Sequence, residues 1–265
     1  MACWKETTAT DADLRLLILL TLRLKGIASF EMLTDTLCVD SDVLLETLDC
    51  YQSEGLVGRR EGDGPGGGWF LTTSGRADGE RLLNDQILAE SQRLDRDIRS
   101  ALFDLYEGFL PLNRRLLDIC TRWQVRSQDP VELNDHDDPD YDAAVLDELR
   151  QIDGQVQWIC GQLEGQLTRF SRYRSGFEYA LARVRNGAVE WFTKPTLPSY
   201  HTLWFELHED LLATLGLDRA AETARQNDPG SPQDERPQSM SRSSRPNSPI
   251  ILETPLNTPL DHEAN

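Results

Sequence analysis

The chain has 265 residues, of which 39% are hydrophobic, and it carries a formal net charge of −18 at pH 7. This length allows one or two globular domains, and the composition argues against a wholly disordered chain. The longest apolar run, residues 14–24, contains Arg15 and Arg23 and is too short to cross a bilayer. We therefore expect no membrane association. Because no secretory pattern precedes this run, we expect a cytoplasmic protein.

The charge distribution and the cysteines narrow the possible functions further. No segment of the chain is basic overall, which disfavours non-specific nucleic-acid binding because phosphate contacts need Lys and Arg. The five cysteines never occur as Cys-x-x-Cys, which argues against a structural zinc site and against a disulfide framework. We expect them to be reduced residues of the core.

The N-terminal part begins with predicted helices. Residues 1–10 are expected to form a flexible leader, and a helix follows over residues 11–25 and ends at Gly26. Ser29 is the predicted N-cap of a second, short helix that ends near residue 37.

A third helix and a hairpin follow. The helix is predicted over residues 41–54, with Asp40 or Ser41 as its N-cap. Two short extended runs, residues 56–60 and 69–72, flank a turn rich in Gly and Pro and predict a β-hairpin. The buried stripe of the third helix is expected to comprise Leu44, Leu45, Leu48 and Tyr51.

A long helix is predicted after the hairpin. Leucines at helical spacing extend it from Thr73 or Ser74 to about residue 108. Pro111 indicates a break, or the first turn of a further helix that ends near residue 124. Residues 127–142 are predicted to form an acidic loop.

The rest of the chain is predicted to be helical up to a polar tail. Helices are expected over residues 141–163 and 166–184, and residues 191–198 are expected to be extended because they contain two prolines. Ser199 is the predicted N-cap of a last helix. From residue 224 the sequence is rich in Pro, Ser and charge, which predicts disorder.

The order helix, short helix, helix, hairpin, helix is that of a winged helix. Within it, the sequence resembles the MarR-like and PadR-like transcription regulators over about residues 12–90. In those families a Gly-Leu-Val turn follows the third helix, then an Arg-containing wing and a Leu-Thr-x-x-Gly-Arg junction. The matching residues are Gly55-Leu56-Val57, Arg59-Arg60 and Leu71-Thr72-Thr73-Ser74-Gly75-Arg76.

The resemblance implies a regulator that binds duplex DNA and does not catalyse a reaction. Helix 41–54 would lie in the major groove, and the wing would contact phosphates. The long helix after the wing resembles a dimerisation helix, which implies a homodimer. The candidate DNA-binding residues are Ser41, Thr47, Gln52, Ser53, Arg59 and Arg60.

The sequence departs from these families on the face of the third helix that would meet DNA. This face offers Asp42, Glu46 and Asp49 and no Lys or Arg. Carboxylates repel phosphates and are costly to desolvate. The alternative function is therefore an acidic winged-helix adaptor that does not bind DNA. Such an adaptor would dock a partner protein through its acidic surface or its tail.

A group of arginines forms a further candidate site. Arg169, Arg172 and Arg174 lie among aromatic residues, which suits an anionic ligand or an acidic partner. In so acidic a chain, the alternative is that these arginines pair with internal carboxylates.

The histidines suggest a third interpretation, a metal-dependent helical enzyme. His136, His201 and His208 lie near acidic residues, which are common metal ligands. However, His201 and His208 are two helical turns apart, about 10 Å, which is too far for one ion. No catalytic motif is recognisable, so we expect a protein that is not an enzyme and that needs neither metal nor cofactor.

The sequence thus predicts a mainly α protein. A winged helix of three helices and a two-stranded wing is expected in residues 11–90. A long helix joins it to a helical bundle for dimerisation or sensing in residues 91–222, and a disordered tail rich in Pro and Ser is expected in residues 223–265.

Overall fold

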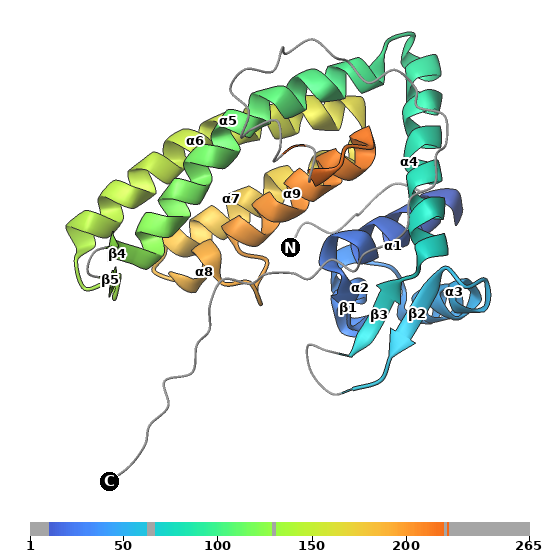
Figure 1. The fold of residues 1–265 in the computed structure, drawn as a ribbon, viewed down its shortest axis with the longest axis horizontal. Helices are drawn as coiled ribbons and strands as arrows, with labels where there is room; N and C mark the ends of the chain where they lie inside the picture. Colours follow the sequence, from blue (N-terminus) through green and yellow to red (C-terminus); the bar gives the residue numbers. More distant parts are fainter. Residues whose placement is uncertain (1–10, 63–66, 129–130, 220–221, 223–265) are drawn as a thin grey trace. The chain divides into compact units, whose positions relative to one another are not determined.

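The computed structural model describes residues 11–62, 67–128, 131–219 and 222 of the chain. These residues form a mainly α-helical structure with two small antiparallel sheets (Figure 1). The leader and the tail, predicted to be flexible and disordered, lie outside the described residues. Within the described ranges, no helix combines the length and the apolarity needed to span a bilayer.

The N-terminal part combines helices with a three-stranded sheet. Strand β3 lies between β1 and β2 and is antiparallel to both. The predicted hairpin is present as β2–β3, with Arg59 opposite Trp69, whereas β1 is too short to leave a pattern in the sequence. The elements are α1 (Asp11–Lys25), β1 (Ile27–Ala28), α2 (Phe30–Leu37), α3 (Ser41–Ser53), β2 (Val57–Arg60) and β3 (Gly68–Leu71).

Side-chain caps and glycines set the limits of these helices. The Ser29 hydroxyl accepts a hydrogen bond from the Met32 N–H, and the Asp40 carboxylate accepts hydrogen bonds from the first turn of α3. Both are predicted caps. Gly26 and Gly55, with φ of 73° and 72°, follow α1 and α3 in the left-handed geometry that favours glycine.

Helix α1 is buried on two faces at once. One face, which includes Ile18 and Leu22, packs in a core with α2, α3 and the sheet. The other face, which includes Leu20, packs against Leu83 and Ala213 farther along the chain. A helix that is apolar all round needs partners on every side. Helix α1 therefore joins the N-terminal part to the helices that follow it.

Helix α3 buries a narrower stripe than the sequence predicts. Leu44, Leu48 and Tyr51 are buried, but Leu45 is 44% exposed. The prediction that Leu45 belongs to the core is wrong. Adjacent helical residues lie about 100° apart around the axis, which carries Leu45 out of the buried arc.

The predicted long helix is two helices, α4 (Thr73–Leu94) and α5 (Ile98–Gln124). The break lies at Asp95, which adopts left-handed geometry with a φ of 49°, and Asp97 caps α5. Thr72, which lies just before the predicted start, caps α4. One uninterrupted helix is therefore a wrong prediction.

Pro111 neither breaks a helix nor begins one, because it lies inside α5. A proline inside a helix removes one backbone hydrogen bond. The adjacent turn is held by Phe109 and Leu112, which are buried in the bundle core. The leucine stripe predicted to dimerise is also packed within this chain, where its buried members are Leu83, Ile87, Ile98 and Leu102.

Beyond α5 the chain forms a second hairpin and the remaining helices. The predicted acidic loop contains the β4–β5 hairpin, and the segment predicted to be extended contains α8. Helix α8 ends before Pro195, because only the residue preceding a proline is pushed into extended geometry, here Lys194 with a ψ of 120°. Ser199 caps α9 as predicted. The elements are β4 (Val125–Gln128), β5 (Val131–Leu133), α6 (Pro139–Gln166), the 3-10 helix η1 (Thr168–Phe170), α7 (Ser171–Arg185), α8 (Glu190–Thr193) and α9 (Tyr200–Leu215).

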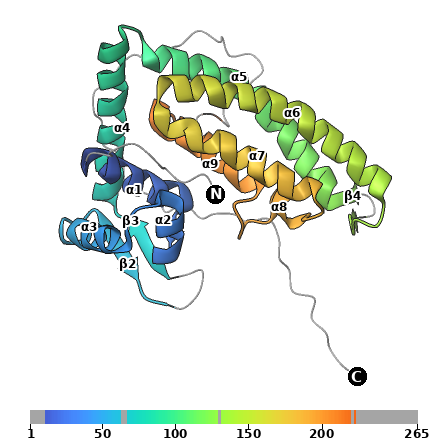
Figure 2. The ribbon, with the colours of Figure 1, turned by 180° about the vertical axis from the view of Figure 1, so that it is seen from behind.

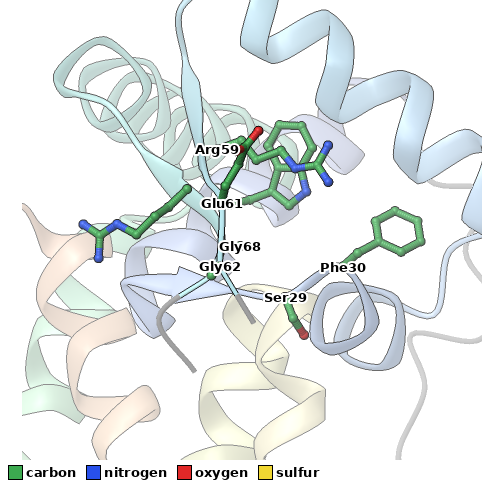
Figure 3. Close-up of a pocket in the computed structure, with 9 residues that line it drawn as sticks. Ser29, Phe30, Arg59, Glu61, Gly62 and Gly68 are labelled. Atoms are coloured by element: carbon green, nitrogen blue, oxygen red, sulfur yellow. The ribbon is translucent and has the colours of Figure 1, made fainter. Parts of the chain in front are cut away.

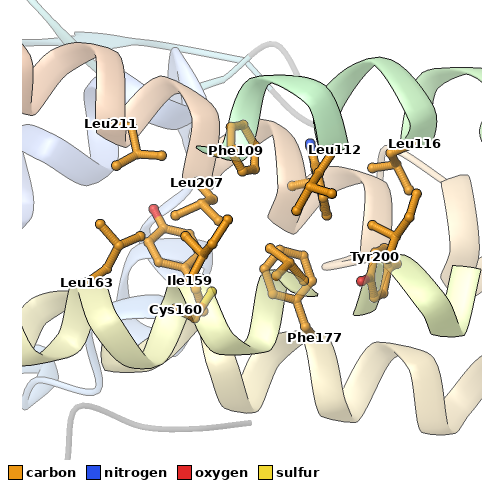
Figure 4. Close-up of a cluster of buried hydrophobic side chains, with 14 of the residues drawn as sticks. Phe109, Leu112, Leu116, Ile159, Cys160, Leu163, Phe177, Tyr200, Leu207 and Leu211 are labelled. Atoms are coloured by element: carbon orange, nitrogen blue, oxygen red, sulfur yellow. The ribbon is translucent and has the colours of Figure 1, made fainter. Parts of the chain in front are cut away.

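The larger core lies between α5, α6, α7 and α9. Figure 4 shows Phe109, Phe177 and Leu207 among the side chains that fill it. Cys120 and Cys160 are in the same core, and burial raises the pKa of each thiol to about 12. Both thiols therefore stay protonated and unreactive at neutral pH.

The cysteines follow their prediction in part. Cys50, Cys120 and Cys160 are free thiols, as expected for reduced residues. Cys38, which follows α2, is disulfide-bonded instead. The expectation of reduced cysteines is therefore wrong at this position.

Two glycines of α4 allow a matched test of the contact between α4 and the hairpin. A Cβ at Gly75 would lie 1.9 Å from the Leu56 carbonyl oxygen, whereas a Cβ at Gly79 would lie 3.6 Å from the Leu19 Cβ. We expect Gly75→Ala to lower the free energy of unfolding by about 2 kcal/mol through overpacking. We expect Gly79→Ala to raise it by about 0.5–1 kcal/mol through helix propensity. Urea unfolding followed by circular dichroism measures both, and equal effects of the two substitutions would contradict this packing.

Candidate interaction surface on α3 and the β2–β3 hairpin

The outer face of α3 carries a row of carboxylates. Asp42, Glu46 and Asp49 are all exposed, and their spacing of four and three residues places them on one side of the helix. We call these three residues the acidic ridge. The buried residues Leu44 and Leu48 lie on the opposite side of α3. The ridge therefore points away from the core that holds the helix.

Apolar side chains lie on both sides of the acidic ridge. Val43 is 46% exposed and Leu45 is 44% exposed. At 100° per residue, they lie about 160° apart around the axis, with the ridge between them. Met32 on α2 is exposed as well. The α3 surface thus combines negative charge with apolar edges.

The acidic ridge has no internal cations, unlike the carboxylates around α1 and α4. Arg15 lies 2.7 Å from Asp78 and 3.0 Å from Glu54, and Arg23 lies 2.9 Å from Glu80. Among the described residues, no Lys or Arg forms an ion pair with any ridge carboxylate. The charge of the ridge is therefore available to a partner.

The polar residues predicted to read DNA are only partly available. Ser41 and Gln52 are exposed on α3. The Thr47 hydroxyl donates a hydrogen bond to the Val43 carbonyl at 2.7 Å, and the Ser53 hydroxyl donates to the carbonyl of Cys50 at 2.7 Å. Hydroxyls that donate to their own helix offer a partner only their acceptor lone pairs.

The two predicted wing arginines lie on β2 and are exposed. The guanidinium carbon of Arg59 lies 5.6 Å from the centre of the Trp69 ring, a cation–π arrangement. Neighbouring strand residues point to opposite faces, so the Arg59 and Arg60 side chains diverge, although both residues contribute to the lining of one pocket beside the hairpin. Neither arginine forms an ion pair within the described part of the chain.

A shallow pocket of about 470 Å³ lies beside this hairpin. Figure 3 shows Ser29 and Phe30 at the start of α2 on one side, and Arg59 and Glu61 on the strand side. The Glu61 carboxylate lines the same pocket as the two arginines. Its negative charge reduces the attraction of the pocket for a phosphate.

The arginines proposed to bind an anion have different environments. Arg169 is buried, donates to the Asp210 carboxylate at 2.5 Å and also donates to the Thr214 hydroxyl and the Gln86 side-chain carbonyl. The Tyr173 hydroxyl donates to the other Asp210 oxygen at 2.9 Å. These contacts join α4, η1, α7 and α9.

Arg172 faces the same buried carboxylate, 3.7 Å from Asp210, and donates to the Tyr173 hydroxyl. Arg174 is 54% exposed and lies 3.9 Å from Glu178. The structure therefore brings Arg169 and Arg172 together around an internal carboxylate, which is the alternative that the sequence left open. Arg174 does not join them, because its side chain is exposed on the surface.

The histidines are distributed over separate contacts. His136 lies 2.9 Å from the Asp142 carboxylate and 3.2 Å from the Asn134 amide. Burial lowers the pKa of His208 to about 4, and burial also lowers the pKa of His201. The described residues contain no group of three or more His, Cys, Asp or Glu placed to hold a metal ion.

The exposed apolar residues of α2 and α3 are the part of this surface that the sequence prediction missed. A signal was present, because Leu45 lies at the edge of the stripe formed by Leu44, Leu48 and Tyr51 rather than within it. A leucine at such a position becomes buried only if another element covers that side of the helix.

No protein-family model, curated protein or solved structure matches this chain. The resemblance to MarR-like and PadR-like regulators therefore stays a prediction.

The network around Asp210 predicts which arginines are structural. Asp210→Ala leaves Arg169 buried without its carboxylate, so we expect the free energy of unfolding to fall by about 3–5 kcal/mol. Arg174→Ala, at an exposed position, is the matched control and should change it by less than about 0.5 kcal/mol. Chemical denaturation measures both. If Asp210→Ala left the free energy of unfolding unchanged, Arg169 would again be a candidate for binding a ligand.

Proposed function

We propose that residues 11–90 form a winged helix of MarR-like or PadR-like type that serves as a protein-interaction module. The chain would then act as a regulatory adaptor, with the α3 surface as its binding face. The observation that carries this proposal is the acidic ridge, which is exposed, unpaired within the described residues and flanked by Val43 and Leu45.

Electrostatic repulsion disfavours α3 in a major groove. Asp42, Glu46 and Asp49 would each face a phosphate-rich surface with no cation beside them. Each carboxylate would need an amine donor to offset its desolvation, and in the major groove only cytosine and adenine edges supply one. The apolar edges formed by Val43 and Leu45 favour a protein surface, because apolar side chains in a groove gain little beyond thymine methyl contacts.

The ridge also defines the chemistry of the partner. Carboxylates at successive helical turns match Lys or Arg repeated every three or four residues on a partner helix. Apolar residues on the same partner helix would pack on Val43 and Leu45. The preferred partner is therefore a basic amphipathic helix of another protein.

Duplex DNA remains the second candidate because of one observation. Arg59 and Arg60 are exposed on β2 and form no ion pair within the described residues, although most arginines around α1 and α4 do. In this alternative the hairpin contacts the backbone, and the acidic ridge faces away from the phosphates.

Charge-neutralised variants test the adaptor proposal. The full chain is titrated into a fluorescein-labelled helical peptide of Lys and Leu, and anisotropy gives the Kd. We expect Asp42→Asn with Glu46→Gln to weaken binding about tenfold, because two cation contacts are lost. The control is Asp104→Asn with Glu107→Gln, which removes the same charge from exposed positions on α5. Equal effects of the two pairs would reduce the interaction to net charge and contradict a defined surface.

Substitution of the two hairpin arginines separates the protein partner from the DNA partner. Arg59→Ala with Arg60→Ala should leave peptide binding unchanged. If the hairpin binds a 20-base-pair duplex, the same variant should reduce the slope of log K against log salt by about 2, since each phosphate contact contributes about 0.9. Tight duplex binding that survives neutralisation of Asp42 and Glu46 and depends on Arg59 and Arg60 would make DNA the partner.

A further inference from the structure

The outward face of α6 carries an exposed tryptophan among glycines. Trp158 is 63% exposed. Gly154, Gly161 and Gly165 lie four residues before it and three and seven after it, which places all four residues on one side of the helix. Helix α6 lies in front of α5 in Figure 2 and behind it in Figure 1. The other face of α6 is buried in the bundle core.

The chain itself does not require glycine at these positions. A Cβ at Gly154 or Gly165 would meet no atom within 4 Å, and a Cβ at Gly161 would meet only an Arg174 nitrogen, at 4.0 Å. Each glycine inside a helix costs about 1 kcal/mol relative to alanine. An exposed indole adds an apolar surface that nothing in the described residues covers.

The same face carries almost no charge in a chain with a net charge of −18. Between residues 151 and 165 the charged side chains are two. Asp153 accepts a hydrogen bond from the Tyr200 hydroxyl at 3.0 Å on the buried side, and Glu164 is half-buried. The exposed polar residues here are Gln151, Gln155 and Gln162. Two copies of this face can therefore approach without the repulsion that other acidic surfaces of this chain would cause.

We propose that α6 forms the interface of a homodimer by packing antiparallel against α6 of a second copy. The two-fold axis lies level with the midpoint between Trp158 and Gly161, on the exposed side of α6. Trp158 then lies on the partner's Gly161, and Gly154 lies against the partner's Gly165, so the backbones come close. This contact is isologous, because the indole and the glycine surface that receives it are on the same helix.

Arg174 completes the site for the inserted indole. It is exposed on α7, and one of its guanidinium nitrogens lies beside Gly161. In the proposed dimer it contacts the partner's Trp158, as arginine does at the face of an aromatic ring. The two ends of the symmetric interface then each contain one indole, one glycine surface and one guanidinium.

A second copy fits this face better than a different occupant because the complementary parts repeat under two-fold symmetry. The helix predicted to dimerise, α4, has a different surface. Its Leu83 and Ile87 are buried within the chain, and its exposed large apolar residue is Leu88, at 59%. The proposal is independent of what binds α3.

Sedimentation equilibrium of the full chain tests the oligomeric state. We expect a dimer of twice the 30.1 kDa chain mass. Trp158→Ala and Gly154→Leu should each weaken the dimer at least about thirtyfold, as expected at an interface hot spot. Helicity should be retained, since leucine at Gly154 favours the helix. The matched controls are Leu88→Ser on α4 and Leu117→Ser on α5, exposed apolar residues that should not change the dimer.

Disulfide trapping tests the register. In a Cys50→Ser background, mixing Gly154→Cys and Gly165→Cys chains under oxidation should give a covalent dimer, and neither variant alone should do so. A monomeric wild-type chain at 100 µM, a dimer that survives Trp158→Ala and Gly154→Leu, or a dimer lost in Leu88→Ser would overturn the proposal.

Discussion

Helix α1 is the constraint on which the arrangement of the described residues depends. Its buried apolar residues lie on two faces, so two cores close on it at once. These are α2, α3 and the sheet on one face and α4 and α9 on the other. The Lys25 ammonium near its end adds an ion pair of 2.7 Å with Glu206 of α9. Because the inner face of α3 is buried in this packing, its outer face, which carries the acidic ridge, stays exposed.

The same packing decides which charges are neutralised. Arg15 and Arg23 leave α1 beside the start of α4 and contact the carboxylates there. Arg169 is enclosed with Asp210, where the loss of hydration is offset by hydrogen bonds that Arg169, Tyr173 and Thr214 donate to the carboxylate. About half of the Lys and Arg side chains in the described residues thus pair with carboxylates of the same chain. The acidic ridge keeps its negative charge because it lies on the side of α3 opposite to the side that these cations contact.

The surfaces of α3 and α6 suit two different partners. The acidic ridge is charged and flanked by apolar residues, which favours a basic amphipathic helix. The α6 face is nearly uncharged and combines Trp158 with open glycine positions, which favours an identical face. The adaptor that we propose would use the α6 face to bring two copies together and would present two acidic ridges to a basic partner.

The sequence by itself determined the local structure. Ser29, Asp40 and Ser199 cap their helices, Gly26 ends α1 and β2 pairs with β3, because each of these features depends on a few neighbouring residues. Only the tertiary structure decided whether Leu45 was core or surface, whether Pro111 ended a helix and whether Arg169 met a ligand or Asp210. These outcomes depend on which distant element covers each side chain, and periodicity along one segment carries no information about that neighbour.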